Sequence, residues 1–504
     1  MRATLTRLSV TARCHIQKRC CGRVPAPEFE YAGDKAEQTH LPRAQQGGFA
    51  RCNFVKATNS SKLKDAYDIA GSVGAGAFGS VCAGRCRKMG HDVAVKTIPK
   101  YSVQDADALQ REIEFMRLTD HPNVARLYEV FEDEDDLHLV MELCSGGELW
   151  KRILSAHEAG LGFSEAELAD ATRQMLRAVA YCHSQSIVHR DIKPENFLFA
   201  SKAPDSPLKL VDFGIGGVVP GERPETRFLT AMVGTDGYMA PEILLSKPYG
   251  PAADLFSVGA VMHAAIVGLP PRWAADKAAY DFPGRMRWRM LSKDAQHLLA
   301  SVLQADPCAR PTAVEALQHP WLSSSRREGS QFDSEEILNR LKSFGRRSKL
   351  ERAARFALVA LNKLRGEEVQ QLQEAFLEAD ADGSGEVTEA ELLAVLQRKG
   401  SQELPEQLFQ HLDSSGEGQI SYTEFLAAAA SNAWVGDSKG AREAFDSLDA
   451  DGDGFISPEE IDAALPGVYT PEELAQEIER LDQDGDGNLN FEEFCRILQE
   501  PVDP

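Results

Sequence analysis

Apolar residues recur at helical spacing in the middle of the chain, between Ser334 and Arg365. Their spacing places them on one face and predicts a single amphipathic helix over this stretch. The apolar face comprises Leu350, Ala354, Ala357, Leu358, Leu361 and Leu364. The basic residues beside it are Arg346, Arg347, Lys349, Arg352 and Arg355. Such a helix can lie on a membrane, fill the groove of a calmodulin-like protein or serve as a linker. The sequences on either side of it must distinguish these three roles.

After this stretch the pattern repeats four times. Twelve-residue acidic loops occupy 380–391, 413–424, 449–460 and 482–493, each with a glycine at position 6 and a glutamate at position 12. Oxygen ligands around a sharp glycine turn are the signature of helix–loop–helix calcium sites. Position 8 is apolar in every loop, which predicts short strands that pair the loops within two lobes. These apolar residues are Val387, Ile420, Ile456 and Leu489.

Each loop offers candidate calcium ligands at positions 1, 3, 5, 7 and 12, where position 7 uses its backbone carbonyl. The first two loops present Asp380, Asp382, Ser384, Glu386 and Glu391, then Asp413, Ser415, Glu417, Gln419 and Glu424. The last two present Asp449, Asp451, Asp453, Phe455 and Glu460, then Asp482, Asp484, Asp486, Asn488 and Glu493. The second loop has the fewest short carboxylates, so we expect it to bind calcium most weakly.

The net charge also differs between the calcium-loop region and the part of the chain that precedes it. The 504 residues carry a net charge of -22 and exceed what one hydrophobic core accommodates, so two or more domains are expected. From Gly366 onward there are 34 acidic and six basic residues, which gives this part -28 and leaves +6 for the rest. An acidic tail could be disordered, but regularly spaced Phe, Leu and Ile indicate a folded cation-binding unit.

The cysteines and the N-terminal segment indicate where in the cell the protein is expected. The ten cysteines show no zinc-ligand spacing, which favours a reduced, intracellular chain, and no apolar run reaches the 18 residues needed to cross a bilayer. The first residues are basic, with Arg2, Arg7, Arg13, Lys18, Arg19 and Arg23. This composition suits an organellar transit peptide or an unstructured tail. Cys20 and Cys21 beside basic residues could be palmitoylated.

A glycine-rich stretch, AGSVGAGAFGSVCAG, places Gly74, Gly76 and Gly79 before Val81. Glycines at these positions let backbone N–H groups approach phosphate oxygens. A dinucleotide-binding turn shares the spacing but is followed by a helix. Here the next segment, DVAVKTI, is typical of a β-strand and contains Lys96. The sequence therefore favours a phosphate-binding loop between two strands.

Further motifs follow in order along the chain. They are REIEFM with Glu112, HRDIKPENFLF with Asp191, LVDFG with Asp212, GTDGYMAPE with Glu242 and DPCAR with Arg310. One motif could arise by chance, but the complete series in this order could not. Residues 67–321 therefore resemble the protein-kinase family, and the KPEN sequence resembles its serine/threonine branch.

The resemblance implies roles for the matching residues. Asp191 would accept the proton of the substrate hydroxyl, and Lys193 would neutralise charge on the transferring phosphoryl group. Asn196 and Asp212 would hold Mg²⁺. Glu112 would pair with Lys96 and hold its ammonium against the ATP phosphates. The implied ATP site comprises Val73, Gly74, Gly76, Gly79, Val81, Ala94, Lys96, Met141, Glu142, Cys144 and Asp212.

Two features concern substrates and regulation. Glu148 and Glu195 match positions that face substrate arginines in similar kinases, so we expect a basic motif near the phosphorylated residue. Arg190 could pair with a phosphate on Thr226 or Thr230, or with an acidic side chain, and the sequence leaves this open. Residues 268–291 are also shorter than in similar kinases, which bears on peptide docking rather than on phosphoryl transfer.

A kinase, a basic junction and four calcium loops in this order resemble the calcium-dependent protein kinases of plants and protists, over about residues 67–498. The resemblance implies a multidomain chain, in which an α+β two-lobed kinase fold precedes an all-α, calmodulin-like EF-hand domain of two lobes. The implied boundaries are a basic segment at 1–66, the kinase at 67–321, an autoinhibitory junction at 322–366, and EF-hand lobes at 367–430 and 431–500.

The same resemblance implies ATP, Mg²⁺ and Ca²⁺ as cofactors and Ser or Thr of proteins as substrates. The junction would block the kinase at low calcium, and the loaded lobes would capture it instead. We expect a cytoplasmic monomer without nucleic-acid partners, attached to membranes only through Cys20 and Cys21. The alternatives are a calcium-responsive scaffold with an inactive kinase fold and a constitutive kinase whose EF hands are structural. The scaffold is disfavoured because the full catalytic set is retained: Lys96, Glu112, Asp191, Asn196 and Asp212.

Overall fold

The computed structural model describes most of the chain from residue 62 onward. The described residues are 62–76, 79–87, 90–103, 106–160, 162–213, 217–218, 229, 231–274, 278–324, 334–360, 367–398, 408–414, 416–431, 438–449, 451–464 and 469–499. Outside them lie the basic N-terminal segment with Cys20 and Cys21, and also Thr226, Thr230, Leu361, Leu364 and Ser415. Among the described helices, none combines the length and apolarity needed to cross a membrane.

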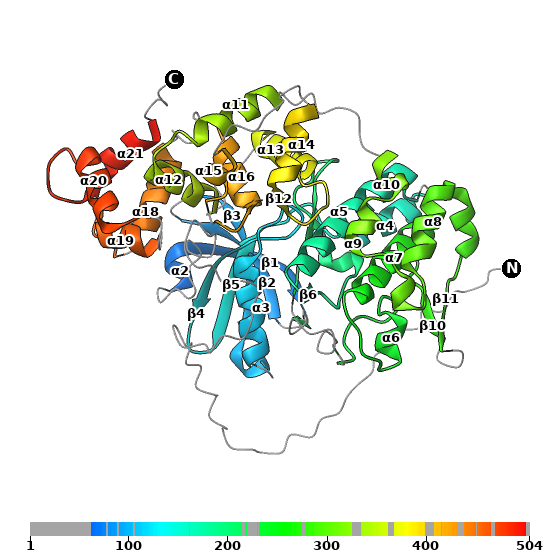
Figure 1. The fold of residues 1–504 in the computed structure, drawn as a ribbon. Helices are drawn as coiled ribbons and strands as arrows, with labels where there is room; N and C mark the ends of the chain where they lie inside the picture. The colour runs from blue at the N-terminus through cyan, green and yellow to red at the C-terminus, as the bar shows by residue number, and fades with distance from the viewer. Residues whose placement is uncertain are drawn as a thin grey trace, which may run out of the picture. The chain divides into compact units, whose positions relative to one another are not determined.

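A five-stranded antiparallel sheet comes first, with strand order β1–β2–β3–β5–β4 (Figure 1). Its strands are β1 (Tyr67–Gly76), β2 (Gly79–Cys86), β3 (Asp92–Pro99), β4 (Leu127–Glu132) and β5 (Asp136–Glu142), preceded by α2 (Leu63–Ala66). After β3 come η1 (Lys100–Ser102) and α3 (Ala106–Leu118). Apolar side chains of α3 and of the strands share one core, among them Ile113, Phe115 and Leu139. This packing brings Lys96 on β3 opposite Glu112 on α3.

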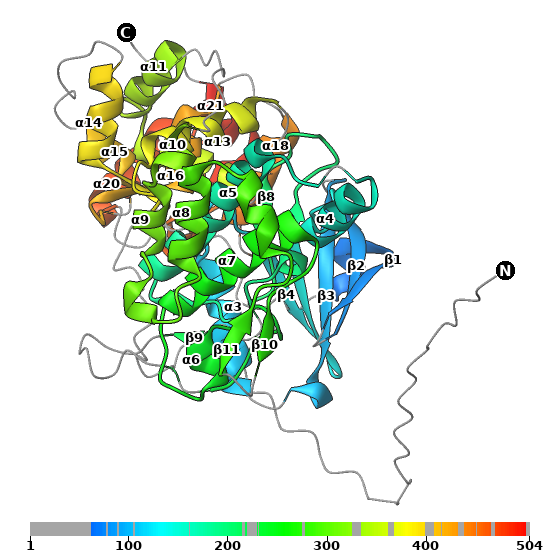
Figure 2. The same ribbon diagram turned by 90° about the vertical axis from the view of Figure 1, so that its right-hand side faces the viewer.

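Helices dominate the next part of the chain. They are α4 (Leu149–Glu158), α5 (Glu165–Ser184), α6 (Pro241–Leu244), α7 (Ala252–Val267), α8 (Lys293–Val302), α9 (Ala313–Leu317) and α10 (Pro320–Ser324). Helix α5 begins at a capping box in which Ser164 and Glu167 each accept the other's backbone N–H. Helix α7 is buried along most of its length, and Figure 2 shows it among its neighbours α5 and α8.

Short strands and turns line the space between these helices and the sheet. They are β6 (Ile187–Val188), η2 (Pro194–Asn196), β7 (Phe197–Phe199), β8 (Leu208–Leu210) and β9 (Gly217–Val218). The short segment 268–291 forms the hairpin β10 (Arg272–Ala274) and β11 (Ala279–Asp281), then η4 (Arg285–Met290), while η5 (Pro307–Ala309) follows α8. Arg310 makes a two-pronged ion pair with Glu242 at 2.6 and 2.7 Å and lies over the ring of Phe256. This buried pair joins two motifs far apart in the sequence.

The junction forms two helices, α11 (Ser334–Phe344) and α12 (Lys349–Ala360), so the prediction of one continuous helix is wrong. The break falls at Gly345, where a Cβ atom would lie 2.9 Å from Nδ1 of His411. Within the described residues, the apolar face is confirmed, since Leu350, Ala354, Ala357 and Leu358 are buried. The basic face differs from expectation, because Arg347 and Arg355 are buried and both pair with Glu351.

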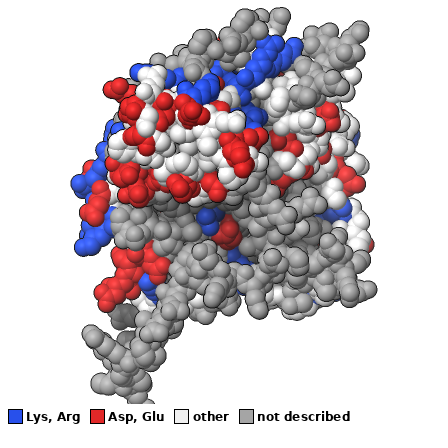
Figure 3. Space-filling view, turned by 60° about the vertical axis from the view of Figure 1, so that its left-hand side comes forward, with Lys and Arg blue, Asp and Glu red and all other residues white. Residues whose placement is uncertain are grey.

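The calcium-loop region forms two EF-hand pairs. The first contains α13 (Glu367–Ala379), β12 (Glu386–Thr388), α14 (Glu389–Arg398), α15 (Leu408–Leu412), β13 (Gln419–Ser421) and α16 (Tyr422–Ala429). The second contains α18 (Ser438–Leu448), β14 (Phe455–Ile456), α19 (Pro458–Ala464), α20 (Pro471–Leu481), β15 (Leu489–Asn490) and α21 (Phe491–Gln499). Val387 pairs with Ile420 and Ile456 with Leu489, which confirms the predicted strand pairing. Figure 3 shows one face of the molecule, on which many Asp and Glu side chains are exposed among Lys and Arg.

Candidate active site and calcium sites

The catalytic-loop carboxylate, Asp191, is surrounded by hydrogen-bond donors. Lys193 Nζ lies 2.6 Å from its Oδ2, and Thr235 donates its hydroxyl to Oδ1 at 2.6 Å. Asn196 Nδ2 donates to the backbone carbonyl of Asp191 at 2.8 Å. The sequence motifs therefore converge as predicted, and Thr235 is an additional member. Its signal was present in GTDGYMAPE, but no role was assigned to it.

Asp254 on α7 holds the backbone of this loop. Its carboxylate accepts the N–H groups of His189 and Arg190, both at 2.9 Å, and pairs with His183 at 2.9 Å. Arg190 has a positive φ of 68°, which leaves the two amides pointing toward α7. Burial alone would raise the pKa of Asp254, but the bonds from His183 and the backbone hold the pKa below its usual value. The sequence analysis did not identify this residue.

Lys96 lies between two carboxylates. Its Nζ is 4.0 Å from Oε1 of Glu112, the predicted partner, and 2.8 Å from Oδ1 of Asp212, which was expected only as a Mg²⁺ ligand. Burial raises the pKa of Glu112 to about 7, and Lys96 only partly opposes this effect. The pKa of Lys96 is raised, because the two carboxylates outweigh the lowering effect of burial.

The implied ATP site is assembled from β1, β2, β3 and the end of β5. Val81 pairs with Gly74 on one side and with Lys96 on the other, and Ala94 pairs with Met141. Glu142, the last residue of β5, turns its side chain toward Lys209 at 2.9 Å. Cys144 is buried, which raises the pKa of its thiol.

The residues proposed for Mg²⁺ suit that ion. Asp212 supplies a carboxylate, and the amide nitrogen of Asn196 is bonded to Asp191, so the amide oxygen is the atom left for a cation. Oxygen ligands of this kind are those that Mg²⁺ prefers.

Three of the four EF-hand loops gather carboxylates in the arrangement that calcium requires. In each group the ligand oxygens lie within 4.8 Å of one another: Asp380, Asp382 and Glu391; Asp449, Asp451 and Glu460; Asp482, Asp484 and Glu493. In the first group, Oδ1 of Asp380 is buried without a hydrogen-bond partner among the described residues. Burial raises the pKa of this carboxyl to about 7, and Asp382 and Glu391 add to the effect. A divalent cation would satisfy these crowded oxygens.

The second loop does not appear among these groups of acidic side chains, which are drawn from the described residues. Asp413 accepts backbone N–H groups from Gly416 and Gly418, both at 2.8 Å. The loop therefore keeps the EF-hand turn. Whether it binds calcium more weakly stays a prediction.

Comparison with known proteins decides the family. Residues 67–322 match the protein kinase domain, and residues 369–430 and 438–499 each match the EF-hand domain pair. The chain is 34% identical over 456 residues to calcium-dependent protein kinase 17 of Arabidopsis thaliana, covering 87% of this chain and 84% of the relative. It is 33% identical over 497 residues to calcium-dependent protein kinase 34 of the same plant, covering 95% and 92%.

The chain belongs to the calcium-dependent protein kinases. It is a calcium-activated serine/threonine protein kinase with ATP, Mg²⁺ and Ca²⁺ as its cofactors. The fold class, enzyme class and cofactors expected from the sequence are thereby confirmed.

In this kinase, the two carboxylates assigned to substrate recognition have different surroundings. Glu148 is partly exposed and pairs with Lys151 at 2.6 Å. Glu195 Oε2 is buried without a hydrogen-bond partner among the described residues. Burial raises the pKa of Glu195, and Glu148 and Asp191 add to the effect. Glu148 and Asp191 have lysine partners, so the Oε2 atom of Glu195 is the one that a cationic side chain would satisfy.

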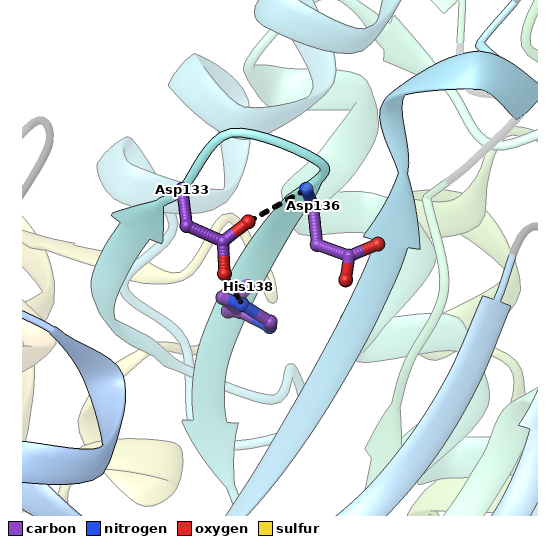
Figure 4. A group of neighbouring side chains, drawn as sticks. All are labelled: Asp133, Asp136 and His138. Carbon is purple, nitrogen blue, oxygen red and sulfur yellow. Dashed lines mark hydrogen bonds and ion pairs between the residues drawn. The ribbon is translucent and has the colours of Figure 1, made fainter.

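A further acidic group of this kinase lies in the turn between β4 and β5 (Figure 4). Asp133 Oδ1 accepts the N–H of Asp136 at 2.8 Å, and its Oδ2 bonds to His138 Nε2 at 3.1 Å. The other ring nitrogen of His138 bonds to Thr97 at 2.9 Å. Because the Asp133 carboxylate and both ring nitrogens of His138 already have partners, we interpret the group as a stabilised turn.

Proposed function

We propose that the junction helices form the calcium-controlled inhibitor of this kinase. The observation that supports this proposal is the enclosure of α12 within the EF-hand region. Leu350 and Leu358 are at most 1% exposed, and they share one hydrophobic core with Phe376 of the first pair and Phe445 of the second. A helix with its apolar face inside both pairs is not free to occupy a second site at the same time.

Polar contacts support the same assignment. Arg352 donates to the backbone carbonyl of His411 at 3.1 Å, and Arg355 donates to that of Ala430 at 3.3 Å. Lys349 pairs with Glu473 of the second EF-hand pair at 3.0 Å. The basic residues that suggested a regulatory helix thus bond to the calcium-binding region. At low calcium we propose that the lobes release this helix, which then blocks the kinase.

For phosphoryl transfer, we propose that Asp191 accepts the proton of the substrate hydroxyl. Thr235 and Lys193 hold its carboxylate in place, because each bonds to one of its two oxygens. When bound, ATP would supply the phosphoryl group, and Mg²⁺ would compensate the charge on it. Asn196 and Asp212 would hold the ion, and Lys96 would orient the phosphates once it leaves Asp212.

We propose that substrates carry a basic residue near the phosphorylated Ser or Thr, because the unpaired Glu195 oxygen and the nearby Glu148 favour a guanidinium.

The protein would act as a cytoplasmic monomer, with any membrane attachment through Cys20 and Cys21. The proposed domain limits remain 67–321 for the kinase, 322–366 for the junction, and 367–430 and 431–500 for the EF-hand lobes.

A phosphorylation assay with and without a calcium chelator tests the proposal on the wild type and on Asp191→Asn. We expect calcium to raise the wild-type rate and Asp191→Asn to lower it by about three orders of magnitude, as removal of a general base with its positioning role does. Undiminished activity in Asp191→Asn would overturn the role of Asp191. A wild type without activity would instead favour a scaffold, and full activity in chelator would favour structural EF hands.

A further inference from the structure

The segment 234–239 connects the catalytic loop to the β10–β11 hairpin. Near its start, Thr235 donates its hydroxyl to Oδ1 of Asp191 at 2.6 Å. At its end, Tyr280 of β11 donates its hydroxyl to the backbone carbonyl of Met239 at 2.7 Å. Figure 2 shows the hairpin beside α6, a helix that begins two residues after this segment. The segment is therefore held at both ends and lies beside the catalytic carboxylate.

Two glycines fix the backbone in the middle of this segment. Gly234 has a positive φ of 131°, and a Cβ atom there would lie 2.9 Å from the carbonyl oxygen of Arg190. Gly237 has a positive φ of 85°, and a Cβ atom there would lie 3.1 Å from Cβ of Pro270. A side chain is therefore disfavoured at both positions. Asp236, which lies between them, has a backbone that is held against the catalytic loop and the start of the hairpin.

Asp236 presents its carboxylate on this fixed backbone. The residue is exposed, and no hydrogen bond or ion pair joins it to another described residue. Its charge nevertheless acts on the hairpin: burial raises the pKa of the Tyr280 phenol, and the charge of Asp236 adds to this effect. The carboxylate is therefore close to β11 and available to a ligand that approaches this side of the active site.

Asp236 and Glu195 belong to the two segments that hold different oxygens of the catalytic carboxylate. Thr235 bonds to Oδ1 of Asp191, whereas Lys193 bonds to Oδ2. Asp236 directly follows Thr235, and Glu195 lies two residues after Lys193. A substrate whose hydroxyl reaches Asp191 therefore meets an acidic residue beside each segment. If a basic residue before the phosphorylated Ser or Thr occupies Glu195, as proposed above, the residue after it faces Asp236.

We propose that Asp236 forms a second substrate subsite, which selects Lys or Arg at the position directly after the phosphorylated residue. The proposal rests on the phosphoryl-transfer function above and specifies the substrates of that reaction more closely. A cation at this position gains the attraction of an exposed carboxylate, whereas a second carboxylate is repelled. Exposed charge pairs of this kind change affinity by a factor of about five at most. The substrate class is thus a protein segment with basic residues on both sides of the phosphorylated residue.

Peptide kinetics at saturating calcium tests this subsite. Three peptides share an Arg three residues before the Ser and differ only in the residue directly after it, which is Lys, Ala or Glu. For the wild type we expect kcat/KM to fall in that order, by about threefold at each step and mainly through KM. Asp236→Lys should reverse the order, because the charge of the subsite is reversed. Asp236→Asn should treat the three peptides alike.

Each comparison is a ratio between peptides for one enzyme, so a loss of folded protein cancels from it. Asp65→Lys is the matched control, because it makes the same change at an exposed carboxylate on α2 and should keep the wild-type order. Equal kcat/KM values of the wild type for the three peptides would overturn the proposal. An unchanged order in Asp236→Lys would also overturn it. If the preference assigned to Glu195 or the junction switch fails, all three peptides are affected equally, so the ratios still report on Asp236.

Discussion

Lys96 Nζ and Glu112 Oε1 face each other at 4.0 Å between β3 and α3. The ammonium is 2.8 Å from Asp212, the proposed Mg²⁺ ligand, so Glu112 must compete for it when nucleotide binds. Replacing Glu112 with Gln keeps the shape and removes the competing charge. We expect kcat/KM for ATP to fall about tenfold to a hundredfold, because the ammonium loses an opposite charge in a buried site.

Steady-state kinetics at saturating calcium measures this effect. Glu114→Gln is the matched control, because Glu114 lies on the same helix and pairs with Arg117 at 3.0 Å, away from Lys96. It should retain the wild-type kcat/KM within about twofold, as surface ion pairs contribute little. Equal values for the two variants would show that Glu112 does not position Lys96.

Glu195 should determine the preference for basic substrates. Its buried, unpaired oxygen gains a partner when a guanidinium approaches, so a peptide with Arg three residues before the Ser should react about tenfold faster than one with Ala. In Glu195→Gln that ratio should fall toward one, mainly through KM. The control is Glu158→Gln at the exposed end of α4, which should keep the wild-type ratio. A wild-type enzyme that treats both peptides alike would refute the assignment.

The sequence identified residues whose roles follow from the motifs themselves, and it missed two whose roles depend on contacts made only in the folded chain. Lys193 and Asn196 lie within a few residues of Asp191, so the motif that contains them was sufficient. Thr235 reaches the same carboxylate from 44 residues away, and only the folded chain brings the two together. Asp254 likewise supports His189 from α7, and its position in an apolar helix gave no sign of that role.

In the junction, the sequence predicted the buried apolar face but neither the break between the two helices nor the burial of Arg355. Its apolar spacing was correct over the described residues, because the buried face depends on local periodicity. The break at Gly345 depends on the approach of His411, which lies 66 residues later in the chain. Arg355 was assigned to a basic surface, but it is buried against Glu351, since an arginine with a paired charge can enter a core.

The apolar face of α12 yields a test of the switch. Leu350→Asp combined with Leu358→Asp places two carboxylates in a core that excludes water, so the lobes should no longer hold the helix. We expect activation by calcium to be lost, with activity at saturating calcium near the level in chelator. The control is Arg346→Asp, an exposed position in the break between the two helices. A normal calcium response in the double variant would remove α12 from the switch.

His263 should make the kinase fold sensitive to mild acid. It is buried in α7, where its Nδ1 accepts the indole N–H of Trp288 at 3.0 Å and Phe282 packs against its ring. Burial lowers the pKa of His263 to about 4, against about 6.5 in an unfolded chain. Between these values the unfolded state binds more protons, so stability is retained above pH 6.5 and is lost as the pH falls toward 4.

His263→Asn offers an acceptor oxygen to Trp288 without a group that titrates in this range. With calcium held saturating, the melting temperature of the wild type should fall more steeply than that of the variant between pH 6.5 and 5. The full difference corresponds to about 3 kcal/mol, from about 2.5 pKa units at 1.36 kcal/mol each. His297→Asn on the exposed face of α8 should follow the wild-type curve. Parallel curves for the wild type and His263→Asn would mean that this imidazole is not held neutral in the folded kinase.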